Sequence, residues 1–245
     1  MRTGIILAAT IFVTSSALAA DIPAPAYRPA PVAPYSWTGI YIGANAGYGW
    51  AKASSQAVLS GNLFVVGSAT DSGDLNGPLA GAQIGANYQN GWGVFGVELD
   101  GQWSNQKSET SFACIPGAIC SESAKIDYFG TARLRFGVAA DQILVYGTGG
   151  IAWTHGSHQA SIAGGGVTVS LFDASTSKIG WTAGGGIEAA LTNNWSAKLE
   201  YLYIQTDGVT LSGPFPVVFG GGTITETVKL SDQIVRFGIN YRFGN

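Results

Sequence analysis

Eight stretches of the chain alternate apolar residues with small or polar ones, which is the pattern of β-strands with two unlike faces. These stretches are 37–51, 79–89, 93–104, 126–138, 143–154, 178–191, 195–204 and 234–243. The connections alternate in length, with long ones at 52–78, 105–125, 155–177 and 205–233 and short ones at 90–92, 139–142 and 192–194. Transmembrane barrels have this plan of long outer loops and tight inner turns. We therefore predict an all-β fold, an eight-stranded antiparallel up-and-down transmembrane β-barrel.

The two faces of each strand differ in a way that indicates which one meets lipid. One face is aliphatic and aromatic, whereas the other is rich in glycine and charge, as suits the narrow interior of eight strands. Aromatic residues gather at both strand ends, where girdles mark the two membrane interfaces. One girdle comprises Trp50, Trp103, Tyr128, Trp153, Trp181 and Tyr203, and the other Tyr88, Phe136, Trp195, Tyr241 and Phe243. The apolar face should therefore lie outside.

Two strands leave the assignment of faces open. In 143–154, Leu144 and Tyr146 compete with apolar residues on the opposite face. In 195–204, Leu202 and Ile204 fall on the otherwise polar face. Two apolar runs in the long connections, 63–66 and 215–219, favour strands that extend beyond the membrane as hairpins.

The N-terminus carries an export signal. Met1-Arg2 is followed by an apolar run over 5–13 and by Ala17-Leu18-Ala19, the features of a secretory signal peptide. We predict a signal peptide at 1–19, a Pro/Ala-rich periplasmic tether at 20–36 and an outer-membrane β-barrel at 37–245. The apolar run is too short to span a bilayer. These features predict a protein of the outer membrane of a Gram-negative bacterium.

Composition agrees with a lipid-facing surface. Only 11% of the residues are charged and 36 are glycine, whereas soluble domains average about 25% charged residues. The net charge of −3 argues against a nucleic-acid partner.

Cys114 and Cys120 lie together in one long connection, and in an exported protein such a pair predicts a disulfide.

Ionisable residues on the predicted inner face are the main candidates for a function. They are Glu98, Asp100, Asp127, Arg133, Arg135, Glu188, Lys198, Glu200, Arg236 and Arg242. Antiparallel pairing should bring Glu98 and Asp100 near Arg133, Glu188 opposite Lys198, and Glu200 near Arg236. Buried ions persist only when paired. These charges could form an ionic plug, a set of ion pairs that closes the lumen, or they could line the constriction of a narrow diffusion channel. The interior of eight strands leaves little room for water, which favours the plug.

No motif points to catalysis or to a cofactor. His155 and His158 could bind a metal only weakly, because two ligands do not close a site; they are more simply solvated loop residues. The glycine triplets at 164–166, 184–186 and 220–222 lack the strand–turn–helix context of a phosphate loop. We therefore expect neither an enzyme nor a cofactor.

Several motifs, taken in order, resemble a known family. They are 37–43 (WTGIYIG), 146–152 (YGTGGIA), 200–203 (EYLY) and 237–243 (FGINYRF). Together they are similar to the small outer-membrane β-barrel proteins of alphaproteobacteria, called outer membrane immunogenic proteins, RopB-type or porin-family proteins. Such barrels usually end on an aromatic residue, whereas here Gly244-Asn245 follow Phe243.

The resemblance implies an outer-membrane location, surface-exposed long loops and a structural or surface-antigen role. It also implies outer-membrane lipid, lipopolysaccharide and the barrel-assembly machinery as partners, and it brings no catalytic residues. Some members are named porins or bind haemin, but no residues of this chain argue for haemin binding.

Overall fold

The computed structural model describes residues 35–60, 68–115, 117–215 and 222–243, and nearly all of them are in strands. The strands are β1 (Gly39–Ser60), β2 (Ser68–Asn90), β3 (Gly93–Ile115), β4 (Ala118–Ala140), β5 (Ile143–Gly164), β6 (Val167–Ala190), β7 (Trp195–Thr206), β8 (Val209–Phe215) and β9 (Gly222–Phe243). Within these ranges, no helix is long and apolar enough to cross a membrane. The predicted signal peptide at 1–19, most of the tether at 20–36, and Gly244-Asn245 lie outside the described residues.

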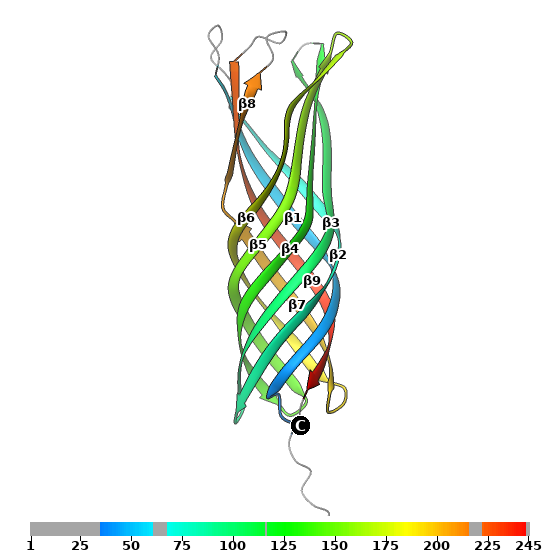
Figure 1. Cartoon of the computed structure of the whole chain (residues 1–245), viewed down its shortest axis with the longest axis vertical. Coiled ribbons are helices and arrows are strands. Elements are labelled where there is room, and N and C mark those ends of the chain that lie inside the picture. Colours follow the sequence, from blue (N-terminus) through cyan, green and yellow to red (C-terminus); the bar gives the residue numbers. More distant parts are fainter. Residues whose placement is uncertain (1–34, 61–67, 116, 216–221, 244–245) are drawn as a thin grey trace, which may run out of the picture. The chain divides into compact units, whose positions relative to one another are not determined.

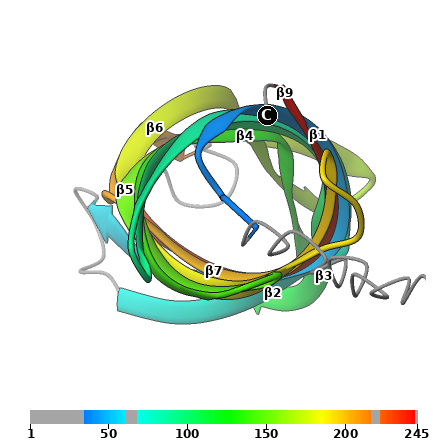
Figure 2. The ribbon, with the colours of Figure 1, turned by 90° about the horizontal axis from the view of Figure 1, so that it is seen from below.

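The strands form one closed antiparallel ring, seen end-on in Figure 2. Each strand from β1 to β7 pairs with the next one along the chain, β7 pairs with β9, and β9 pairs with β1 to complete the ring. The short β8 pairs with the outer part of β9, whereas β7 pairs with its inner part. β7 and β8 therefore share one position in the ring, which gives the predicted eight-stranded up-and-down topology.

The apolar face of the strands is the outer one, as predicted. Ile40 of β1, Leu99 of β3, Leu134 of β4 and Phe237 of β9 all have exposed side chains, at more than half of their full accessible area. The side chains that alternate with them point into the ring and are buried. A barrel in lipid needs this arrangement, because its solvent on the outside is hydrocarbon. The aromatic residues at both strand ends also point outward; Trp103 and Tyr88, one from each end, are 74% and 63% exposed.

The short turns lie at one end of the ring and agree with the prediction. β2 and β3 are joined through Gly91-Trp92, and β4 and β5 through Asp141-Gln142. Gly91 and Asp141 take φ values of 60° and 52°, the left-handed conformation that a two-residue hairpin requires and that Gly and Asp tolerate.

The predicted long connections at 105–125 and 155–177 are wrong as loops. β3 continues to Ile115 and β4 begins at Ala118, and β5 and β6 continue to a turn at Gly165-Gly166, where both residues have positive φ. Most of the described parts of 52–78 and 205–233 are also strand, whereas residues 61–67 and 216–221, which hold the apolar run 63–66 and most of the run 215–219, lie outside the described residues. Strands β1 to β6 are 22 to 24 residues long, so they extend well past a span of about ten residues.

Above the outer aromatic girdle the ring divides into two groups of strands, visible at the top of Figure 1. Pairing between β2 and β3 stops at Asn76 and Lys107, and pairing between β6 and β7 stops at Gly180 and Thr206. Beyond these points β3, β4, β5 and β6 form one sheet, and β2, β1, β9 and β8 form another.

The cysteines lie in the β3–β4 hairpin. Cys120 is in β4 and pairs in register with Phe112 of β3. No free cysteine is found among the described residues. The side chain of Cys114 lies outside the described part of the chain, so the Cys114–Cys120 disulfide stays a prediction.

Candidate functional site: the filled lumen

Eight of the ten predicted interior charges form one continuous cluster of ion pairs inside the ring. They are Glu98 and Asp100 of β3, Arg133 and Arg135 of β4, Glu188 of β6, Lys198 and Glu200 of β7, and Arg236 of β9. The side chains are essentially inaccessible to solvent. The cluster, called the ionic layer below, holds four positive and four negative groups and is therefore neutral.

Two arginines form the centre of the ionic layer. Arg133 is ion-paired with Glu98, with Asp100 at 2.9 Å and with Glu200 at 3.0 Å. Arg236 contacts the same three carboxylates, at 3.5 Å, 3.0 Å and 2.6 Å respectively. Each guanidinium therefore bridges β3 and β7 across the lumen, and its fixed fork of N–H donors suits several carboxylates at once.

Lys198 and Arg135 extend the layer. Lys198 lies opposite Glu188 in the β6–β7 register, as predicted, but its Nζ is 2.8 Å from Glu98 Oε2 on the far side of the ring. The ion-pair partner of Glu188 is instead Arg135, at 2.7 Å. Sheet register alone does not select the partner, because interior side chains of a narrow ring can meet across it.

Two buried tyrosines link further strands to the ionic layer. Tyr41 of β1 donates its hydroxyl to Glu98 Oε2 at 2.7 Å, and Tyr146 of β5 donates to Glu200 Oε1 at 2.9 Å. The Arg135 guanidinium lies 3.9 Å from the centre of the Tyr146 ring, within cation–π distance.

Inward glycines make room for these rings. A Cβ at Gly85 would overlap the Tyr41 ring, and one at Gly186 would overlap the Tyr146 ring. The glycine-rich inner face seen in the sequence is thus a packing requirement of the large interior side chains.

Asp127 lies apart from the ionic layer. It pairs with Lys125 at 2.8 Å, and both side chains are partly exposed. The β4–β5 register shifts between Ile126 and Tyr128, and such a bulge re-aims the side chain of the extra residue. The structure therefore does not bring Asp127 into the interior charge network.

Arg242 also lies apart, at the short-turn end. Its guanidinium lies 4.5 Å from the centre of the Tyr35 ring and donates to the Asn193 carbonyl at 2.6 Å. It makes no ion pair with a carboxylate among the described residues.

The short-turn end of the lumen is closed by an apolar cap that the sequence did not predict. Trp37 is only 2% exposed; its Nε1 donates to the Asp141 carbonyl at 3.1 Å, and its backbone N–H donates to Gln89 Oε1 at 2.7 Å. Tyr35 packs edge-on against it, with ring centroids 5.1 Å apart. The cap comprises Trp37, Val94, Ala139, Leu144, Tyr146 and Ala190, with Tyr35 packed against them.

A second apolar layer lies on the outer side of the ionic layer. Leu202, Ile204 and Ile234 are at most 1% exposed and point inward. This layer comprises Ala51, Leu75, Leu79, Ile126, Phe129, Ala152, Leu202, Ile204 and Ile234. The apolar residues that interrupted the alternation of strands β5 and β7 therefore belong to these two interior layers. That interruption was the feature of the sequence from which the layers could have been predicted.

The described residues offer little for metal or cofactor chemistry. Among them, no group of three or more His, Cys, Asp or Glu side chains could hold a metal ion. His155 points away from the lumen; its ring stacks on Tyr128 at 4.6 Å and its nitrogens contact the hydroxyls of Ser175 and Ser177 at 3.0 Å and 2.9 Å. What the interior can do physically is hold eight strands together and exclude water.

Comparison with known proteins agrees with this architecture. The model of the outer membrane protein beta-barrel domain matches residues 5–243. The 31 kDa outer-membrane immunogenic protein of Brucella melitensis biotype 1 is 35% identical over 99% of this chain and 100% of its own length. The 25 kDa outer-membrane immunogenic protein of Brucella abortus biovar 1 is 34% identical over 98% and 96%. The 22 kDa outer membrane protein of Rhizobium leguminosarum bv. viciae is 31% identical over 71% of this chain and 67% of its length.

Solved structures share the fold at low sequence identity. The outer membrane protein OprG from Pseudomonas aeruginosa covers 86% of this chain and 99% of its own, with a TM-score of 0.53 and 14% identity. The outer membrane protease OmpT from Escherichia coli covers 87% and 99%, with a TM-score of 0.51 and 9% identity. At such identities the likeness is one of fold alone.

Proposed function

Because this chain belongs to the outer membrane protein β-barrel family and lies in the outer membrane, we propose that it is a structural surface protein whose lumen is a permanent plug. In this proposal the barrel anchors four outer hairpins, and the hairpins make the contacts of the protein with its surroundings. The barrel does not catalyse a reaction.

The filled lumen is the observation that carries the proposal. A neutral layer of eight buried ions lies between two apolar layers, one around Trp37 and the other around Leu202. Moving a solute through would separate several buried ion pairs, and each broken pair costs about 3–5 kcal/mol. Water would also have to wet two apolar layers.

The outer hairpins support a role in surface contacts. They extend beyond the membrane as two groups of paired strands and carry exposed apolar side chains such as Phe112 and Ile119. Two relatives are called immunogenic proteins, which favours a surface-antigen role here. The contacts nearest to the barrel would be those with outer-leaflet lipid and lipopolysaccharide, and the strand ending at Phe243 would be read by the barrel-assembly machinery.

The alternative is a narrow porin-type diffusion channel for small solutes. It requires that the ionic layer open or that its ions exchange with water. Swelling of proteoliposomes in small sugars distinguishes the two. With the purified, folded barrel inserted, we expect a swelling rate equal to that of protein-free liposomes, with a known porin as the positive control. A size-dependent increase in swelling would support the channel and contradict the plug.

A further inference from the structure

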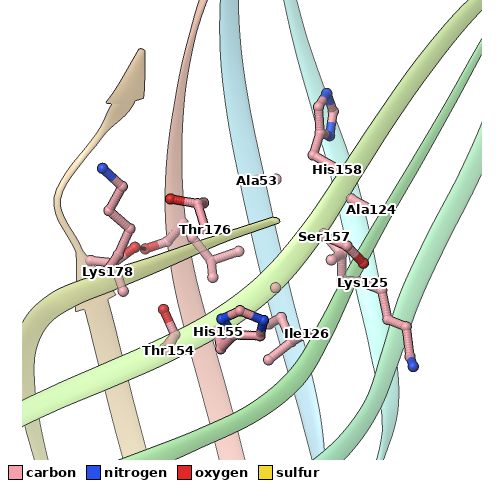
Figure 3. A pocket seen from close by; sticks show the side chains of 14 residues that line it. Ala53, Ala124, Lys125, Ile126, Thr154, His155, Ser157, His158, Thr176 and Lys178 are labelled. Atoms are coloured by element: carbon pink, nitrogen blue, oxygen red, sulfur yellow. Dashed lines mark hydrogen bonds between the residues drawn. The ribbon is translucent and has the colours of Figure 1, made fainter. Parts of the chain in front are cut away.

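We propose that the outer mouth of the barrel holds a binding site for a small amphipathic anion, a short-chain carboxylate. The site is a cavity of about 100 Å³ directly above the outer apolar layer, shown in Figure 3. Its walls come from seven of the strands around the ring, including Leu75 of β2, Ile126 of β4, Lys178 of β6 and Leu230 of β9. We call it the mouth cup.

The floor of the mouth cup is apolar. Leu75 and Ile126 are 2% and 3% exposed, and they are part of the outer apolar layer. Ala53, Ala124 and Leu230 pack against that layer and line the cavity. A closed apolar cavity of about 150 Å³ admits benzene, so this smaller cup suits a short alkyl chain.

One cation faces the cup without a carboxylate beside it. Lys178 points inward, is half-buried, and makes no ion pair among those that the structure describes. Figure 3 shows Lys178 and His158 on two sides of the cavity, and it shows the Lys125 ammonium directed away from it. Lys125 is instead paired with Asp127. An ammonium beside an apolar floor is complementary to a carboxylate with an apolar tail.

The hydroxyls at the same level complete the polar rim. Thr154, Thr176 and Thr206 line the cavity. Thr206 donates its hydroxyl to the Leu230 carbonyl at 3.4 Å, whereas the hydroxyls of Thr154 and Thr176 can donate to a carboxylate oxygen. The cup also lies where the ring divides, since the β6–β7 pairing ends at Gly180 and Thr206. A ligand can therefore reach it from outside the cell, whereas the layers below prevent it from passing further.

The test follows the isoleucine methyl signals of the whole barrel in micelles during titration with butanoate, hexanoate and octanoate. The Ile126 methyl should shift and saturate, and affinity should rise about fourfold per methylene until the cup is full. Lys178→Gln should weaken hexanoate binding about tenfold but leave binding of the neutral hexanamide unchanged. Ala124→Leu should abolish both by filling the cup, whereas the matched Ala113→Leu on an exposed hairpin position should not.

Three results would overturn the site. The first is an Ile126 shift that persists in Ala124→Leu. The second is equal binding of hexanoate and hexanamide by wild type. The third is a shift of the outward-facing Ile187 methyl in parallel with that of Ile126, without saturation, because that would mean partition into the micelle only.

Discussion

Lys198 Nζ lies 2.8 Å from Glu98 Oε2, which joins β7 to β3 across the interior of the ring although Glu188 is the direct sheet neighbour of Lys198. Glu98 accepts in addition from Tyr41 and pairs with three arginines. One carboxylate therefore organises much of the ionic layer. Its removal is the most direct way to ask whether that layer stabilises the barrel.

Glu98→Ala should destabilise the barrel by at least about 3 kcal/mol, because it leaves several cations buried without their shared partner. The measurement is the urea midpoint of unfolding in micelles or liposomes. Glu109→Ala, at an exposed hairpin position, is the matched control and should leave the midpoint nearly unchanged. Equal midpoints for wild type and Glu98→Ala would show that the ion pairs do not hold the barrel together.

Asp232 should make stability depend on pH in the direction opposite to that of an ion-paired carboxylate. It lies just beyond the outer aromatic girdle, next to Gln233, the register partner of Trp50. Burial raises the pKa of Asp232 to about 7 from a usual value of 3.8, and hydrogen bonds from the Gln106 amide, 2.9 Å away, and from the Gln233 backbone only partly oppose this shift. The folded state thus favours the neutral acid.

A raised pKa means that the contribution of Asp232 is fully present below about pH 4 and is lost as the pH rises towards 7. Asp232→Asn removes this titration and keeps an acceptor for Gln106. Between pH 4 and pH 8 the free energy of unfolding of Asp232→Asn should rise, relative to that of wild type, by on the order of 4 kcal/mol. Asp127→Asn, at a partly exposed position, serves as the control. A difference that does not change with pH would show that Asp232 ionises freely in the fold.

Trp37→Ala should loosen the short-turn end of the barrel. Trp37 is buried in the apolar cap and fixed by hydrogen bonds to Asp141 and Gln89, and removal of a buried tryptophan costs about 3 kcal/mol. Thermal unfolding in micelles measures the loss. Trp92→Ala, at a neighbouring turn position where the side chain is 71% exposed, should cost much less. Similar losses in the two variants would mean that Trp37 is not packed as described.

Cys114 and Cys120 should resist thiol labelling in the unfolded protein until a reductant is added, because an exported pair at this spacing forms a disulfide. Alkylation followed by mass spectrometry measures this. The double variant Cys114→Ser with Cys120→Ser should still fold, since the ring closes through β1 and β9 rather than through this hairpin. Quantitative labelling without reductant would contradict the disulfide.

The number of strands, their order and their outward face could be predicted from the sequence, because the lipid-facing side chains repeat with period two. The hairpin lengths could not. Outside the membrane no lipid selects an apolar outer face, so segments such as 105–125 lose the alternation that marks strands and look like loops.

The interior was predicted in its composition but not in its pairing or its layers. Sheet register places Glu188 beside Lys198, yet the contact is made with Glu98 across the lumen, and no spacing along the chain encodes that distance. Asp127 was misplaced because the bulge beside it leaves no mark in the alternation. Leu202 and Ile204 were ambiguous because the rule that apolar residues face lipid fails where the lumen itself has an apolar layer.

Single-channel recording of the mature barrel in a planar bilayer tests the central claim most directly. With folding and insertion verified on the same preparation, the plug predicts no conductance steps in 1 M salt, and none after Lys178→Gln, which alters only the mouth. Reproducible ohmic steps from the wild-type barrel would mean that the ionic layer lines a path for ions, and the account of a closed lumen would be wrong.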